Sequence, residues 1–354
     1  LKIRVNLFQH FSNHLAFQSL SLCDQIFLEL KSDSFLFMEM GLDPGIDHMS
    51  AMKVIDKLKI TSEILEFESY TGGLIDYDKE ENPWGYKFTW NPMNVILAGS
   101  DNAYYIENYK KVFVPYKKLF KNIKDINIPG VGLFEGYPNR DSLKYKDLYK
   151  LDNIKNLRRG TLRNKSFCGS WNIFVQLGLT DNDFVINNAN KMSHFDFFSM
   201  TKFSKDKSSF LRFIQDEYNL ENDCDEIKNL KWIGMFSDEK ISLSRGTAAE
   251  ILLHIINKKW TLNDNELDLI VMYHKFIFEE NGIKKVLFSY LKVRGENKIK
   301  TAMAKTVGLP IAILVEYIIE SGLQIKGINL PFDKKIYIPV LNKLKYNGIS
   351  FEEK

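Results

Sequence analysis

The pattern of apolar and polar positions predicts a strand, a tight turn and a helix near the start of the chain. Residues 34–40 form a short apolar run typical of a strand, and the glycine-containing turn 41–45 follows it. Apolar side chains then recur every third or fourth position, which predicts a helix over 46–58. We expect Asp43 to cap this helix and Pro44 to be its first residue. A strand, a glycine turn and a helix in this order are typical of a ligand-binding edge in an α/β sheet.

Further strands and helices are predicted downstream. Residues 64–70 partly alternate between apolar and polar side chains, which predicts a strand that ends at Thr71-Gly72-Gly73. The segment 301–321 has the spacing of a long helix, interrupted at Gly308-Leu309-Pro310. Periodicity leaves 265–273 open between helix and strand. Helices are also expected at 95–98, at 162–178 and, as peripheral elements, within 181–225.

Composition places the chain among ordinary globular proteins. Its 354 residues allow two or three domains, and 45% apolar with 26% charged residues argue against disorder. Lys and Arg total 48 against 45 Asp and Glu, and this net charge of +3 is too mild to indicate a nucleic-acid or membrane partner. The most apolar stretch, 307–319, contains Glu316 and is shorter than the roughly 20 residues of a membrane span. The expectation is therefore a soluble chain.

Three cysteines, Cys23, Cys168 and Cys224, fit neither a secreted disulfide framework nor a zinc site. This indicates a reducing, cytoplasmic location. His10 and His14 could share one helix face, but no third metal ligand lies nearby in the sequence, so no metal site is expected.

The turn at residues 41–48 and three arginines are the candidate chemistry. The turn has two interpretations that stay open: a helix start, or a place where a ligand approaches the backbone and an anion meets helix N–H groups. Arg140, Arg159 and Arg163 could bind carboxylates in bidentate pairs, although each alone is also typical of a solvated surface. His48 and His274 are candidates for acid–base work. Neither a G-x-G-x-x-G motif, nor a Walker loop, nor a nucleophile elbow occurs in the sequence.

Five blocks in a fixed order carry a resemblance to a known family. The blocks are 41–49 (GLDPGIDHM), 69–74 (SYTGGL), 82–90 (NPWGYKFTW), 137–142 (YPNRDS) and 159–163 (RGTLR). Together they resemble the saccharopine dehydrogenase family, glutamate-forming branch. Weaker matches continue at 232–238, 264–275 and 303–313, so the resemblance covers most of the chain from residue 34 onward.

The resemblance implies an α/β fold with a Rossmann-type dinucleotide-binding domain and a mixed α/β substrate domain. On this basis we expect a remnant of the first domain at 1–60, the substrate domain at 61–300, and C-terminal helices at 301–354 that pack back near the first domain. The implied activity is an oxidoreductase of lysine metabolism. It interconverts saccharopine with L-glutamate and 2-aminoadipate 6-semialdehyde, using NADP or NAD.

The resemblance also assigns residues. By position, Asp43 would be the catalytic residue that orients the substrate amine. The residues implied to contact saccharopine are Asp43, Arg140, Thr161, Leu162 and Arg163. Leu42 and Asn91 would lie against the cofactor. Saccharopine is the implied small-molecule partner, and a homodimer stays possible.

Two departures from the family pattern matter. Thr71 stands where the family usually has Cys. The first hundred or so family residues, with the glycine-rich loop that holds the cofactor pyrophosphate, have no counterpart, so we expect a truncated chain. An alternative is a catalytically inactive remnant or interaction subunit that retains a carboxylate-binding cleft. An enzyme reducing another imine, as in polyamine synthesis, is disfavoured because its substrate carries fewer carboxylates for the arginines.

Overall fold

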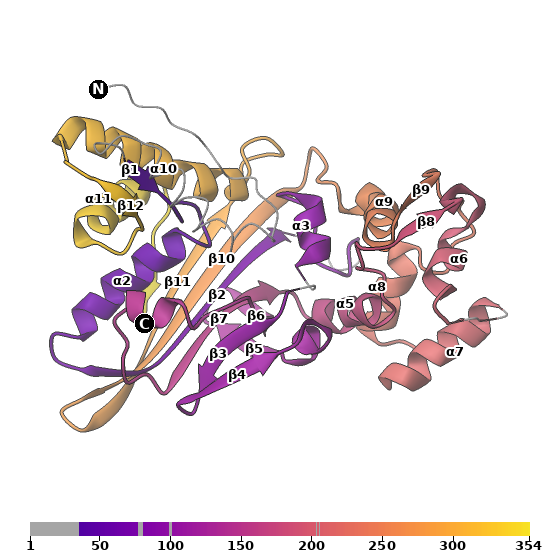
Figure 1. The fold of residues 1–354 in the computed structure, drawn as a ribbon, viewed down its shortest axis with the longest axis horizontal. Helices are drawn as coiled ribbons and strands as arrows, with labels where there is room; N and C mark the ends of the chain where they lie inside the picture. The colour runs from indigo at the N-terminus through magenta and orange to yellow at the C-terminus, as the bar shows by residue number, and fades with distance from the viewer. Residues whose placement is uncertain (1–34, 77–80, 99–100, 203, 205) are drawn as a thin grey trace.

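A computed structural model describes residues 35–76, 81–98, 101–202, 204 and 206–354 (Figure 1). His10, His14 and Cys23 lie outside these residues. A long mixed sheet runs through the middle of the molecule, with three helices at one end and a helical lobe at the other (Figure 1). The fold is mixed α/β, as expected.

The central sheet has the strand order β13-β11-β10-β2-β7-β3-β4, and β6 pairs with both β7 and β5. Among the described strands of this sheet, β2 and β7 form the one parallel pair, and all other neighbouring pairs are antiparallel. The strands are β2 (Glu63–Asp76), β3 (Ala103–Glu107), β4 (Lys110–Val114), β5 (Lys124–Ile128), β6 (Gly132–Pro138), β7 (Asn156–Arg163), β10 (Leu267–Glu280), β11 (Ile283–Arg294) and β13 (Glu352–Glu353).

Three helices cover one face of the long strands (Figure 1). They are α2 (Ile46–Leu58), α10 (Ala302–Ser321) and α11 (Lys334–Tyr346). Beside them β1 (Phe35–Phe37) pairs in parallel with β12 (Gly327–Asn329). One apolar cluster joins these helices to the sheet and contains Ile46, Phe67, Ile313 and Tyr337. These residues come from all three expected ranges. The described parts of 1–60, 61–300 and 301–354 therefore share one core.

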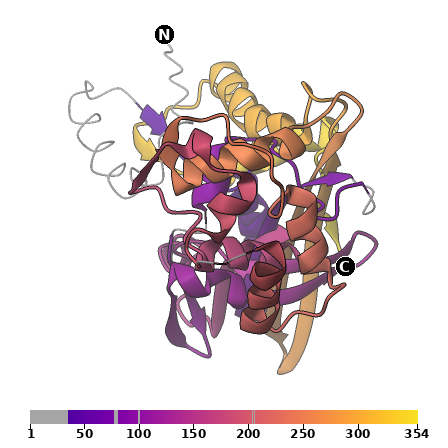
Figure 2. The ribbon, with the colours of Figure 1, turned by 90° about the vertical axis from the view of Figure 1, so that its right-hand side faces the viewer.

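The helical lobe, which faces the viewer in Figure 2, is filled by a second apolar cluster that extends to β3, β4 and β6 of the sheet. Its elements are α5 (Phe167–Gln176), β8 (Val185–Asn187), η2 (Ala189–Lys191), α6 (His194–Ser199), α7 (Lys207–Tyr218), α8 (Asp225–Ile233), β9 (Arg245–Thr247) and α9 (Ala248–Trp260). Trp84, Trp171 and Trp260 are fully buried at its centre, with ring centroids 5.2–6.4 Å apart. The short elements α3 (Pro92–Leu97) and η1 (Tyr116–Lys121) pack against the lobe, whereas α4 (Tyr145–Leu148) belongs to the core around α2.

Several predicted elements are confirmed with changed bounds. The predicted helix 46–58 coincides with α2, and the undecided stretch 265–273 falls mostly in strand β10. The strand predicted at 64–70 does not end at Gly72-Gly73, because β10 pairs with β2 beyond these glycines. The expected interruption at Gly308-Leu309-Pro310 is also wrong: α10 runs through it with Pro310 buried inside the helix.

Helix α10 is longer than the apolar stretch expected from the sequence. Among the described residues it alone is long and apolar enough to cross a membrane, by length and composition. The core helix of a soluble protein meets the same criterion, so this is weak evidence. Ile313, Leu314 and Ile318 of α10 are buried in the core that α10 shares with the sheet.

Candidate functional site

The turn between β1 and α2 places Asp43 against the interior strands β2 and β7 of the central sheet, where it contacts Thr71 and Arg159. Its backbone closes on itself: the Gly41 N–H donates to the Pro44 carbonyl at 3.1 Å, and the Ile46 N–H donates to the Gly41 carbonyl at 2.9 Å. Gly45 has φ 149°, and a Cβ there would overlap the Gly41 backbone, so glycine is required. Gly45 is the N-cap of α2 and makes no side-chain cap. The expected capping by Asp43 is therefore wrong, because its carboxylate is engaged elsewhere.

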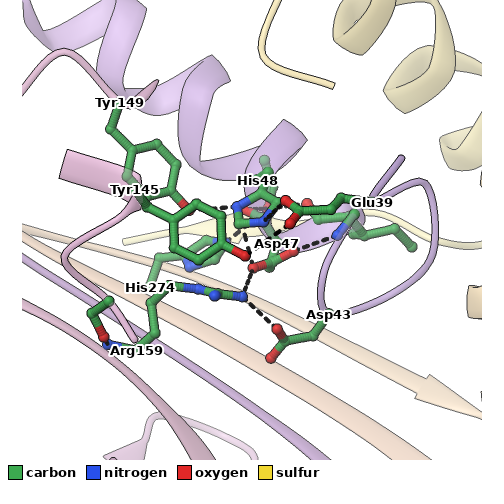
Figure 3. Close-up of polar contacts among 12 residues, drawn as sticks. Glu39, Asp43, Asp47, His48, Tyr145, Tyr149, Arg159 and His274 are labelled. Atoms are coloured by element: carbon green, nitrogen blue, oxygen red, sulfur yellow. Dashed lines mark hydrogen bonds and ion pairs between the residues drawn. The ribbon is translucent and has the colours of Figure 1, made fainter. Parts of the chain in front are cut away.

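Asp43 and Asp47 bind the same nitrogen of Arg159 (Figure 3). Nη2 of Arg159 lies 2.5 Å from Oδ1 of Asp43 and 2.5 Å from Oδ2 of Asp47. The guanidinium also lies over the ring of Tyr145, 4.3 Å from its centroid. Asp47 is fully buried, whereas the Asp43 side chain keeps 18% exposure. Of the two carboxylates, Asp43 is thus the one that a ligand can reach.

Next to the cluster of Asp43, Asp47 and Arg159, a buried polar network surrounds His48 (Figure 3). Nδ1 of His48 is 2.7 Å from the Tyr149 hydroxyl, and its Nε2 is 3.1 Å from Oε2 of Glu39. The Tyr145 hydroxyl donates to the other Glu39 oxygen at 3.1 Å. These contacts fix the ring of Tyr145 and, through it, the plane of Arg159.

The charges of the network separate the carboxyl pKa values. Burial and the nearby Asp47 charge raise the pKa of Asp43, against the opposing pull of Arg159. Burial also raises the pKa values of Glu39 and Asp47, but His48 and Arg159 together with neighbouring donors outweigh it, so the pKa of Glu39 falls to about 2 and that of Asp47 is lowered. Asp43 is thus the carboxyl of these three whose pKa is raised, which suits it to proton exchange with a ligand.

Arg163 forms a second feature on the same face of β7. Alternation along a strand places residues 159, 161 and 163 on one face. The buried Arg163 guanidinium lies 4.8 Å from the ring centroid of Tyr86 and 5.0 Å from that of Phe167. Its Nη1 donates to the Leu162 carbonyl at 3.2 Å, and its Nε has no hydrogen-bond partner among the described residues. Glu135, its register partner on β6, accepts the backbone N–H groups of Ser166 and Cys168. A buried cation with unused donors is suited to a carboxylate ligand.

Of the remaining predicted substrate residues, Thr161 lies on the same face of β7 as Arg159 and Arg163, whereas Leu162 and Arg140 lie elsewhere. Thr161 pairs with Thr71 across β2 and β7, beside Asp43. Leu162 lies on the opposite face of the strand, in a separate apolar cluster with Tyr70, so only its carbonyl serves the site. Arg140 lies in a turn and is half-exposed, with its Nε 3.7 Å from Oδ2 of Asp101.

The two residues predicted to lie against a cofactor have other contacts in the structure. Leu42 is buried in the core shared by α2 and the sheet. Asn91 caps α3, where its Oδ1 accepts a hydrogen bond from the Met93 N–H at 3.0 Å. Over the described residues no group of three or more His, Cys, Asp or Glu side chains is arranged to hold a metal ion.

Sequence reasoning missed three parts of the site. Arg159 was recognised as a candidate by residue type but not as the partner of Asp43, and Asp47 and Tyr145 were not singled out. One signal was available: Asp47 follows Asp43 by four positions at a helix start, so both side chains can meet one cation. Nothing in the sequence places Tyr145 against Arg159, because that contact depends on the fold.

Comparisons with known proteins agree with the resemblance. Residues 41–349 match the family described as "Saccharopine dehydrogenase C-terminal domain". Saccharopine dehydrogenase [NADP(+), L-glutamate-forming] of Saccharomyces cerevisiae is 32% identical over 340 residues, covering 92% of this chain and 74% of the yeast protein. The mitochondrial alpha-aminoadipic semialdehyde synthase of Rattus norvegicus is 34% identical over 325 residues. The match covers 88% of this chain but only 34% of the rat protein, so the chain spans about a third of that relative.

Solved structures give the same picture. Apo saccharopine dehydrogenase (L-Glu forming) from Saccharomyces cerevisiae superposes with a TM-score of 0.82 at 30% identity, over 98% of this chain and 78% of the yeast chain. A homospermidine synthase from Legionella pneumophila in complex with NAD has a TM-score of 0.51 at 10% identity, over 98% of this chain and 68% of the other, which shows likeness of fold alone.

Proposed function

Because this chain belongs to the saccharopine dehydrogenase family of lysine-metabolism oxidoreductases, we propose that its cleft binds saccharopine for interconversion with L-glutamate and 2-aminoadipate 6-semialdehyde. The observation that carries the proposal is one strand face of β7 on which Arg159 holds Asp43, an accessible carboxyl of raised pKa, while Arg163 is a buried arginine whose Nε has no partner among the described residues.

The spacing of these groups suits an extended amino acid with several carboxylates. Four residues along a strand separate positions 159 and 163 by on the order of 13 Å. Saccharopine has a secondary amine, charged at neutral pH, between two arms that end in carboxylates. Asp43, held beside Arg159, would accept the N–H of that amine, and Arg163 would pair with a carboxylate at the far end. Apolar walls from Tyr86 and Phe167 would strengthen this pair by excluding water.

Asp43 would also move the proton that the chemistry requires. Conversion of the secondary amine to an imine releases a proton from nitrogen, and a nearby carboxylate can accept it. The raised pKa of Asp43 brings this acceptor closer to neutrality than an ordinary aspartate. Thr71, with its hydroxyl beside Asp43, would help to orient the carboxylate.

The family reaction needs NADP or NAD as hydride carrier, but the start of helix α2, beside Asp43, does not fit the pyrophosphate of either. The first N–H groups of α2 are already used by the turn, since those of Ile46 and Asp47 donate to Gly41 and Leu42. The buried Asp47 carboxylate at this helix end would also repel a phosphate. We derive no step through the dinucleotide and assign to this chain the substrate side of the site.

Saccharopine binding tests this proposal without requiring turnover. Ligand-detected NMR should show binding to the unmodified chain, and Asp43→Asn and Arg163→Gln should each weaken it by roughly ten- to a hundredfold, because charge-assisted pairs contribute about 1.5–3 kcal/mol. Arg212→Gln, at an exposed position of α7, is the matched control and should leave the affinity unchanged.

The result also separates the alternatives. Binding that resists both site substitutions would overturn the assignment of the cleft. Normal binding without turnover in the presence of NADP and NAD would favour the catalytically inactive, carboxylate-binding remnant.

We further propose that the protein is cytoplasmic, works without nucleic-acid or membrane partners, and is able to form a homodimer. Support for a reducing compartment comes from Cys168 and Cys224, which are both free thiols.

A further inference from the structure

Asp47 has contacts that no feature of the proposed substrate binding requires. It is fully buried and shares Nη2 of Arg159 with Asp43, at 2.5 Å to each carboxylate. Its other oxygen accepts the Gly45 N–H at 2.6 Å. The carboxylate is therefore tied both to the turn that carries Asp43 and to the cation that Asp43 needs, and it cannot rotate away from either.

The groups around Asp43 come from every packed element. The turn and α2 contribute Asp47 and His48, the segment after β1 contributes Glu39, β7 contributes Arg159, β2 contributes Thr71, and α4 with its C-terminal neighbour contributes Tyr145 and Tyr149. The Arg159 guanidinium and the His48 ring thus face three carboxyl groups. One nitrogen of Arg159 shared by two carboxylates favours protonation of one of them, and of the pair Asp43 keeps 18% side-chain exposure whereas Asp47 is fully buried.

We propose that Asp47 is a positioning residue that competes with Asp43 for one nitrogen of Arg159, and so keeps Asp43 able to exchange a proton with a bound substrate amine. The inference rests on the proposed function only for the identity of that amine. The competition itself is a property of the chain without ligand.

The competition has a definite sign. With Asp47 ionised, its charge repels the Asp43 carboxylate and takes part of the Arg159 donor, and both effects favour protonated Asp43. Removal of the Asp47 charge leaves the whole guanidinium to Asp43 and must move the Asp43 titration to lower pH. A role confined to packing would not move this titration in that direction.

The titration can be followed directly by NMR of the full chain with ¹³C-labelled aspartate carboxyls, with Asp43 assigned from the spectrum of Asp43→Asn. In Asp47→Asn, which keeps the size of the side chain and an oxygen for the Gly45 N–H, we expect the Asp43 titration to shift to lower pH. Asp56→Asn removes a carboxylate from the same helix, where Asp56 accepts from the Tyr337 hydroxyl, and should leave the Asp43 titration unchanged.

A second variant covers the case in which Asp47→Asn does not fold. In Asp47→Ser, whose hydroxyl can still accept the Gly45 N–H, the same charge is absent, so the Asp43 titration must again move to lower pH. An unchanged or upward titration of the remaining carboxyl would overturn the proposal. Since no saccharopine is present, this outcome is independent of the binding test above, and failure of saccharopine to bind would leave the titration result standing.

Discussion

Arg159 stacks on Tyr145, with the guanidinium carbon 4.3 Å from the ring centroid, and the hydroxyl of the same ring donates to Glu39 at 3.1 Å. Tyr145 therefore connects two groups of residues by two different contacts. Its ring face contacts Arg159, which binds Asp43, and its hydroxyl contacts Glu39 of the network around His48. These contacts can be separated by substitution.

Tyr145→Phe removes only the hydrogen bond to an ionised carboxylate and should lower the free energy of unfolding by about 1.5–3 kcal/mol. Tyr145→Leu also removes the cation–π contact and should cost about 1–2 kcal/mol more. Urea unfolding monitored by circular dichroism measures both variants. Equal losses would mean that the ring face of Tyr145 contributes nothing to holding Arg159.

His274 predicts a specific pH dependence of stability. It is fully buried, its Nε2 contacts the Ser50 hydroxyl at 2.8 Å, and burial lowers its pKa to about 3 from the ordinary value of 6.5. The unfolded chain therefore binds one more proton than the folded chain between these two values. The contribution of neutral His274 is fully present above pH 6.5 and is lost progressively as the pH falls toward 3.

In the window from pH 6 to pH 4, this group alone should make the free energy of unfolding fall by about 1.4 kcal/mol per pH unit. His274→Gln should be less stable at neutral pH but should show a slope shallower by that amount. Urea titrations at three pH values in this window measure the slope. Parallel slopes for the two proteins would show that His274 does not stay neutral in the folded chain.

Gly160 is predicted to tolerate no side chain. A Cβ at this position of β7 would overlap the ring of Tyr70 and the carbonyl of Tyr137. Gly160→Ala should therefore destabilise the fold by about 1–3 kcal/mol. Gly308→Ala is the matched control: nothing lies within 4 Å of its Cβ position in α10, so alanine should stabilise this helix by about 0.5–1 kcal/mol. Thermal unfolding should thus move the two midpoints in opposite directions.

The strongly periodic parts of the fold could be predicted from the sequence. Helix α2 coincides with its predicted range because its apolar face has regular spacing over 13 residues. Strand β10 could not be distinguished from a helix, since it is buried on both faces through its middle and therefore lacks alternation. The continuation of β2 through Gly72 was missed because glycine serves there for close approach to Leu162, not for a turn.

In the site, too, local sequence patterns could be interpreted, whereas contacts between residues far apart in the sequence could not be predicted. The resemblance of the 41–49 and 159–163 blocks predicts roles for Asp43 and Arg163, and these roles stay predictions. The expected helix cap failed because Asp43 binds Arg159, which is 116 positions away in the sequence. Local patterns cannot show which of several arginines meets a carboxylate when the pairing depends on the register of β7 against β2.

Dinucleotide affinity is a further expected outcome. Since the N-terminal N–H groups of α2 are occupied within the turn and the sequence has no G-x-G-x-x-G motif, this 354-residue chain should bind NADP and NAD weakly or not at all. Isothermal calorimetry at millimolar dinucleotide tests this. Micromolar affinity for either dinucleotide would show that other residues of the chain form a pyrophosphate site.

The two arginines implied to bind saccharopine should differ in importance. Arg163 is buried, with unused donors, whereas Arg140 keeps half of its side-chain exposure, 50%, and lies 3.7 Å from Asp101. An exposed charge contributes little because water screens it, commonly below about 1 kcal/mol. Arg140→Gln should therefore weaken saccharopine binding by less than about fivefold, against ten- to a hundredfold for Arg163→Gln. If both substitutions weakened saccharopine binding by the same large factor, Arg140 would have to leave Asp101 and contact the bound substrate. The saccharopine affinity of Asp101→Asn would then show whether the ion pair with Asp101 holds Arg140 away from the substrate.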